Sequence, residues 1–106
     1  MKIAYRTKKI RTICEKQPIA EKTFGIEAAS YLRARLEDIN SAKCLSDLIA
    51  GSPKELENGV IQVSLGKGHI LKIKSNHPKK PVRKDKNLDW DKVKRIQIVE
   101  IGGTSA

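Results

Sequence analysis

Apolar and polar residues alternate in two stretches of the second half of the chain, and a third stretch is rich in β-branched residues. These patterns predict β-strands at residues 60–65, 69–74 and 93–101. Residues 66–68, Gly-Lys-Gly, separate the first two stretches, and because glycine tolerates positive φ they predict a hairpin turn. Three consecutive strands form a meander, and the rest of the chain must cover one of its faces.

The first half of the chain carries mainly the three-to-four-residue spacing of amphipathic helices. Residues 2–6 predict a short first strand, after which Thr7 can cap a helix over residues 8–17. A second helix is predicted from Pro18 to residues 40–41, with an interruption at Gly25. These two helices are expected to form an antiparallel hairpin that covers the sheet.

The order of these elements, β-α-α-β-β-β, predicts an α+β fold with a small antiparallel sheet and a helix hairpin packed on one face. A chain of 106 residues is long enough for one domain, residues 1–106, with a modest core. No apolar run reaches the roughly 20 residues that a membrane span requires, and the first residues lack the apolar segment of a signal peptide. We therefore expect a cytoplasmic protein without a membrane partner.

Positive charge is the strongest signal in the composition. The chain has 22 Lys and Arg against 12 Asp and Glu, a formal net charge of +10. Residues 67–95 contain eleven basic and three acidic residues, so this part alone carries +8. Such a charge suits a polyanionic partner, either nucleic acid or an acidic protein segment. The alternative is a solvated basic surface that binds nucleic acid only in passing.

Residues 75–91 show no periodic pattern and predict a loop of 17 residues, a length typical of functional or mobile loops. Trp90 is predicted to pack the end of this loop onto the sheet rather than to stack on a base. The spacing of Asp85, Asp89 and Asp91 fits no known metal loop and indicates a capped turn.

The two cysteines also give no sign of a metal site. Cys14 and Cys44 lie 30 positions apart, without Cys or His neighbours at ligand spacing, so both are expected to be free thiols. Gly-rich phosphate loops and nucleophile motifs are absent from the sequence as well. We expect neither a metal nor a cofactor.

Several short motifs nevertheless resemble those of one known family. They lie at residues 33–39, 47–48, 55–56, 81–82, 88–90 with Val93, and 95–101, and the most specific is Leu88-Asp89-Trp90 before the last strand. The chain resembles the RelE/ParE superfamily of bacterial type II toxins, in particular the HigB-like killer-protein branch. The resemblance implies a helix hairpin on a small antiparallel sheet, metal-independent cleavage of mRNA on the ribosome, and neutralisation by a cognate antitoxin. The ParE branch instead poisons DNA gyrase.

The chain departs from this family at three places where its members tend to keep catalytic side chains. These are residues 57–59, Glu-Asn-Gly; residues 69–70, His-Ile; and the C-terminal residues 102–106. A second hypothesis is therefore a catalytically impaired protein of the same fold that binds an antitoxin or nucleic acid. A gyrase-poisoning toxin is a third, weaker hypothesis.

Metal-free RNA cleavage needs a base, an acid and cations that face the phosphate. His69, Lys72 and Lys74, on the second predicted hairpin strand, are the candidate catalytic residues. Strand alternation places His69 on the side of Leu71 and Ile73, so a partly buried structural histidine is an open alternative. For the lysines, the alternative is a solvated sheet face.

The remaining basic residues of this region are candidates for RNA binding through phosphate contacts, because Lys acts as a point charge and Arg as a bidentate fork. They are Lys67, Lys79, Lys80, Arg83, Lys84 and Arg95. The other histidine, His77, precedes Pro78 in the loop and is expected to be exposed to solvent.

Overall fold

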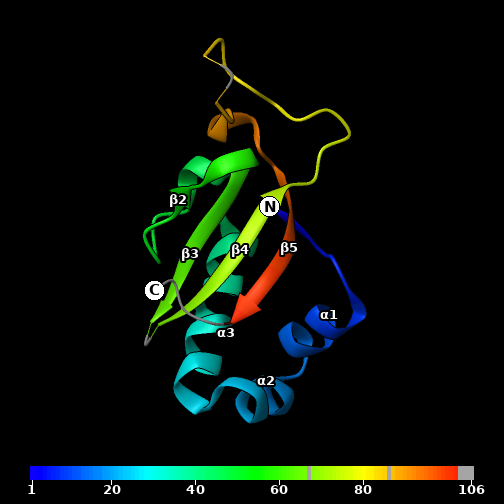
Figure 1. The fold of residues 1–106 in the computed structure, drawn as a ribbon, viewed down its shortest axis with the longest axis vertical. Helices are drawn as coiled ribbons and strands as arrows, with labels where there is room; N and C mark the ends of the chain where they lie inside the picture. The colour runs from blue at the N-terminus through cyan, green and yellow to red at the C-terminus, as the bar shows by residue number, and fades with distance from the viewer. Residues whose placement is uncertain (67, 86, 103–106) are drawn as a thin grey trace.

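Five strands and three helices form two layers in the computed structural model, which describes residues 1–66, 68–85 and 87–102 (Figure 1). The strands are β1 (Lys2–Tyr5), β2 (Lys54–Glu55), β3 (Val60–Gly66), β4 (His69–Ser75) and β5 (Arg95–Gly102). The helices are α1 (Lys8–Glu15), α2 (Gln17–Phe24) and α3 (Ile26–Ser41). The predicted α+β class is confirmed.

The sheet is mixed, so the prediction of an antiparallel sheet was wrong. Its strand order is β1-β5-β4-β3-β2, and β1 runs parallel to β5 while all other neighbours are antiparallel. The reason is the path of the chain. The three helices carry it from β1 beneath the sheet to the far edge, and the meander from β2 to β5 then returns it beside β1. An antiparallel meander of four strands ends opposite in direction to its first strand, β2. Since β1 also runs opposite to β2, β1 and β5 are parallel.

The strand β2 was not predicted. It consists of Lys54 and Glu55, which pair with Gln62 and Ile61 of β3. Two residues cannot display a period of alternation, so the sequence carried no signal for this strand.

The helical layer contains three helices rather than the predicted two. The first begins as expected, because the Ile10 N–H donates to Thr7 Oγ1 at 3.1 Å. The predicted second helix is divided at Gly25, whose φ of +91° belongs to the left-handed region that favours glycine. Gly25 ends α2 and begins α3, and this corner turns α3 along the sheet.

The core lies between α3 and one face of the sheet. Ala29, Leu32 and Ile39 of α3 are buried against residues such as Val63 and Ile73. In Figure 1, α3 runs behind the sheet, while α1 and α2 gather at its lower end. Burial of these aliphatic side chains is the main source of stability in so small a domain.

The loop predicted at residues 75–91 has internal structure. Val82 and Leu88 form an antiparallel bridge, and the Arg83 N–H donates to the Asn87 carbonyl at 2.8 Å. The Asn87 N–H donates to Asp85 Oδ1 at 3.0 Å, and this bond lowers the pKa of the Asp85 carboxyl. The turn predicted at residues 88–91 is a single helical turn over Trp90–Lys92, and the side chain of Asp89, which precedes it, makes no capping hydrogen bond.

Candidate nucleic-acid interface

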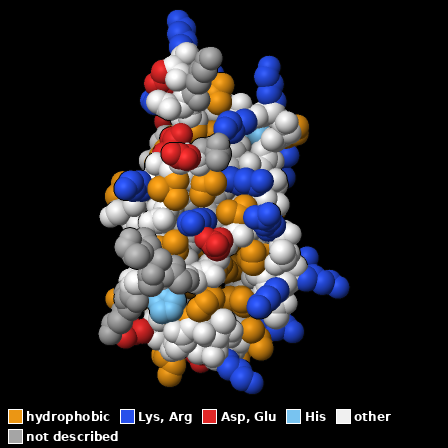
Figure 2. Space-filling model, in the orientation of Figure 1, with side chains coloured by type: hydrophobic (Ala, Val, Ile, Leu, Met, Phe, Trp, Pro, Cys, Tyr) orange, Lys and Arg blue, Asp and Glu red, His pale blue; other side chains and the backbone are white. Residues whose placement is uncertain are grey.

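The sheet has one face against the helices and one face without a helix, and the two-residue period of β4 separates them. Leu71 and Ile73 are 0% exposed and point toward the helices. Lys72 and Lys74 occupy the alternate positions of the strand and point to the other side. We call this other side the open face; it is formed by Gln62, Ser64, Lys72, Lys74, Gln97 and Glu100. Figure 2 shows Lys and Arg side chains scattered over this side of the molecule, with acidic groups between them.

A hollow of about 910 Å³ lies on the open face. Its lining includes the apolar side chains of Val60 and Val99 and the cations Arg6 and Lys72. Three carboxylates, Glu55, Glu57 and Glu100, belong to the same lining, while loop residue Asn87 borders it. The hollow therefore combines apolar surface with charges of both signs.

Lys72 and Glu100 form an ion pair in this hollow. Lys72 Nζ lies 3.0 Å from Glu100 Oε2, and the two side chains are 31% and 58% exposed. A register shift between Lys72 and Ile73 leaves Val99 as the extra residue of β5 and sets Glu100 opposite Lys72. A solvent-accessible carboxylate beside an ammonium group provides a proton acceptor next to a cation.

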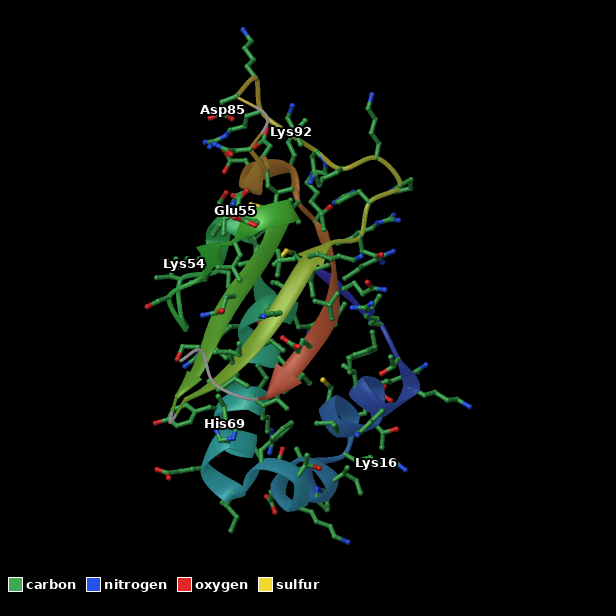
Figure 3. All side chains as sticks on the ribbon, viewed as in Figure 1. Lys16, Lys54, Glu55, His69, Asp85 and Lys92 are labelled. Atoms are coloured by element: carbon green, nitrogen blue, oxygen red, sulfur yellow. The ribbon has the colours of Figure 1, made fainter. Side chains whose placement is uncertain are left out.

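His69 lies away from the lysines. Its ring meets the Phe24 ring edge-on at a centroid distance of 5.7 Å, and its Nδ1 is buried without a hydrogen-bond partner among the described residues. The side chain borders a pocket of about 600 Å³ at the corner between α2 and α3 (Figure 3). The three predicted catalytic residues are thus divided between the two sides of β4, as the alternation along that strand indicated.

Arg95 joins the lysines on the open side of the sheet. It is exposed, and it lies two residues before Gln97, which pairs with Lys74. Its Cα partner in β1 is Lys2. The register therefore groups Lys2, Lys74 and Arg95 at one end of the open face. The sequence analysis did not find Lys2, because its position beside Arg95 depends on the parallel pairing of the two strands.

The remaining predicted RNA-binding residues do not form one group. Lys79, Lys80 and Lys84 are exposed, and the side chain of Lys80 folds back against Gly59, the residue before β3. Arg83 instead forms an ion pair with Asp85 at the tip of the loop, where its Nη2 lies 3.5 Å from Asp85 Oδ2. Lys67 lies outside the described residues.

Glu55 fastens the loop to the sheet. Its Oε1 accepts a hydrogen bond from Trp90 Nε1 at 2.9 Å, and its Oε2 accepts one from the Leu88 N–H at 3.3 Å. Leu88 is buried in the core, and Trp90 packs against it. These contacts support the predicted structural role of Trp90.

His77 fastens the other end of the loop. The Lys94 N–H donates to His77 Nε2 at 3.0 Å, and the Asn76 N–H donates to the Arg95 carbonyl at 2.9 Å. The imidazole is half-buried rather than exposed as expected. Its Nε2 accepts a hydrogen bond, so this nitrogen carries no proton.

The sequence analysis also missed Arg6, Glu57 and Glu100 as members of the hollow. Arg6 follows β1, Glu57 precedes β3 and Glu100 lies in β5, so only the tertiary structure brings them together. For Glu100, alternation from Ile96 and Ile98 would place it on the covered face. The extra residue Val99 moves it to the open face, and no sequence signal marks this bulge.

The structure contains two free thiols, Cys14 and Cys44, both half-buried. Burial, with a smaller contribution from the neighbouring Glu15, raises the pKa of Cys14 to about 12. Within residues 1–66, 68–85 and 87–102, no group of three or more His, Cys, Asp or Glu side chains could hold a metal ion. No helix in the same ranges is long and apolar enough to cross a membrane.

Comparison with known proteins adds no relative. No protein-family model, no curated protein and no solved structure matches this chain.

Proposed function

We propose that this chain is the toxin of a bacterial type II toxin–antitoxin pair, a metal-independent endoribonuclease that cleaves mRNA on the ribosome in the cytoplasm. The observation that carries the proposal is the open face of the sheet, where the Lys72–Glu100 pair lies in a hollow and Lys74 and Arg95 lie nearby. The RelE/ParE-like motifs of the sequence supply the reaction class. An antitoxin with acidic segments would neutralise the toxin by covering these cations.

The chemistry of RNA cleavage assigns roles to the groups in the hollow. Attack of a 2′-hydroxyl on the adjacent phosphate breaks the bond from phosphorus to the 5′-oxygen, and it requires a base and an acid. Glu100 or Glu57 can accept the proton of the 2′-hydroxyl, and the ammonium group of Lys72 can give a proton to the leaving 5′-oxygen. Lys72 and Arg6 can balance the negative charge that develops on the phosphate. Within this proposal Glu100 takes the role that the sequence analysis gave to His69, because His69 faces the other side of β4.

The test is induced expression of the chain in a bacterial host, with growth and message ends as readouts. We expect growth arrest and new internal ends in ribosome-bound messages. Lys72→Met and Glu100→Gln should each reduce cleavage by about 10²-fold or more, the contribution of one positioned acid or base. Arg33→Ala is the matched control, because this cation is exposed on α3. Normal growth and intact messages in the presence of folded protein would exclude the endoribonuclease.

A second function is a protein of the same fold that binds an antitoxin or RNA without cleaving it. The specific observation in its favour is the position of His69, packed against Phe24 and away from the lysines. In this case messages stay intact, but the folded protein binds single-stranded RNA. The triple substitution Lys72→Ala, Lys74→Ala and Arg95→Ala should then weaken binding. The slope of log K against log salt should fall by about 0.7 for each phosphate that the variant no longer neutralises.

A further inference from the structure

The strand β1 forms one edge of the sheet, and no described strand pairs with its outer side. It pairs with β5 alone. The Lys2 N–H donates to the Lys94 carbonyl at 3.1 Å, and the Arg6 N–H donates to the Ile98 carbonyl at 3.0 Å. Alternate residues of a strand direct their backbone groups to the same side. Ile3 and Tyr5 therefore direct their N–H and carbonyl groups away from β5.

The two edges of the sheet differ in how they are protected. At the far edge, β2 is only two residues long and follows Pro53. Beyond β2, the Ser64 N–H of β3 donates to the Gly51 carbonyl at 2.8 Å. Short strands and prolines are common means of preventing unwanted strand pairing. The outer side of β1, by contrast, offers donors and acceptors at Ile3 and Tyr5 without such protection.

A groove of about 570 Å³ runs along this edge, between β1 and the start of α1. Its lining contains three cations, Arg6, Lys8 and Arg11, and one carboxylate, Glu15. Glu15 is already bound by Arg11, with Nε and Oε1 3.0 Å apart. The groove therefore has an excess of positive charge beside the unpaired backbone groups.

We propose that the β1 edge is a docking site for an extended acidic segment of a partner protein, which adds to the sheet as a sixth strand. Main-chain hydrogen bonds to Ile3 and Tyr5 supply the pairing, and Arg6, Lys8 and Arg11 select carboxylates. A second copy of this chain fits less well, since pairing through β1 would bring like-charged edges together in a molecule of net charge +10. This docking site does not depend on the proposed nuclease activity.

The probe for this site is a fluorescently labelled peptide in which Glu and Val alternate over eight residues, titrated by anisotropy at low salt. Two isomers carry N-methyl groups, one on every Val and the other on every Glu. Strand pairing uses only one of these two sets of amides, so we expect one isomer to bind at least tenfold more weakly and the other to bind within about threefold of the parent peptide. Equal binding of all three peptides, or no binding of any, would overturn the proposal.

Substitutions in the protein test the same contacts from the other side. Ile3→Pro removes an outward N–H while leaving the bonds from Lys2 and Arg6 to β5, and edge strands tolerate proline. It should weaken peptide binding at least tenfold. The double substitution Lys8→Glu and Arg11→Glu should do the same and should allow a Lys-Val peptide to bind. Lys9→Glu, on the same helix but outside the groove lining, is the matched charge control and should have less than a twofold effect.

Amide hydrogen exchange gives a direct readout that does not need a variant. The Ile3 and Tyr5 amides should exchange at least tenfold more slowly in the peptide complex than in the free protein. Unchanged exchange at both positions, despite saturated binding, would place the peptide elsewhere and overturn the proposal. Sedimentation that detects a dimer abolished by Ile3→Pro would assign the edge to a second copy and overturn the acidic partner.

Discussion

The two faces of the sheet are built from the same strands, yet different forces determine them. On the covered face, residues such as Val63, Ile73 and Ile98 are 0% exposed and pack against the helices. On the open face, Lys72, Lys74 and neighbouring polar residues occupy the alternate positions of those strands and keep contact with solvent. One side is therefore constrained by packing, and the other is left available for charge.

This difference separates stability from function within one element. A core position has close neighbours on every side, so any change of volume is felt there. A charged residue on a solvated face has weak and screened interactions within the molecule. Consecutive residues of β4 should therefore respond very differently to substitution.

The largest effect is expected for Ile73→Ala. Ile73 is 0% exposed in the core, so the substitution removes buried methyl groups and leaves a cavity. We expect the free energy of unfolding to fall by about 2 to 5 kcal/mol in urea denaturation. The matched control is Lys74→Ala, at the next position of β4, on the open face. This substitution should change the free energy of unfolding by less than about 0.5 kcal/mol. Similar losses for both variants would break the distinction between the faces.

A smaller effect is expected for Glu55→Ala, at the edge where the loop meets the sheet. The substitution deprives the Trp90 indole and the Leu88 amide of their acceptor. We expect a loss of about 1 to 3 kcal/mol in stability, together with a red shift of Trp90 fluorescence as the ring becomes more exposed. The exposed Glu57, replaced by Ala, serves as the control. An unchanged emission maximum would show that Glu55 does not hold the indole.

The Lys72–Glu100 pair should contribute still less to stability. Because both side chains reach solvent, we expect a coupling free energy below about 1 kcal/mol in a double-mutant cycle of Lys72→Met and Glu100→Gln. The same variants should nevertheless each reduce the proposed cleavage of mRNA by about 10²-fold or more. A coupling of several kcal/mol would identify the pair as a structural element of the sheet.

Near neutral pH the smallest effect on stability comes from Cys14, because its thiol loses a proton only at high pH. Burial raises the pKa of Cys14 from its ordinary 9.0 to about 12. Above pH 9 the unfolded chain therefore loses this proton while the folded chain retains it, so the stability contributed by Cys14 is complete below pH 9 and declines as the pH rises toward 12. The unfolding free energy of the wild type should fall relative to that of Cys14→Ala over this range, as measured by urea denaturation. A difference in unfolding free energy between the two proteins that stays constant over this pH range would contradict the raised pKa of Cys14.

Much of the local structure could be predicted because its causes are local. The hairpin strands β3 and β4 follow from alternation, and the start of α1 follows from the side chain of Thr7. Packing of Trp90 at the end of the loop was also predicted, although no local pattern indicated that Glu55 would bind its indole.

The candidate site was predicted less completely, because its members come together only through pairing between strands. Alternation along the strand predicted Lys72 and Lys74 on one side and His69 on the other. The structure has His69 on that other side. The sequence could not indicate Lys2 beside Arg95 or Glu100 beside Lys72. Those neighbours depend on a parallel pairing and on a bulge, which are properties of two strands at once.

The sequence alone thus determined which residues are apolar, where the chain alternates and where it bends, because these depend on neighbours a few positions apart. Only the tertiary structure decided which strands lie side by side, which edge stays unpaired and which charges meet in the hollow. The physical reason is that long-range pairing is selected by the packing of the whole core, and no short segment contains that information.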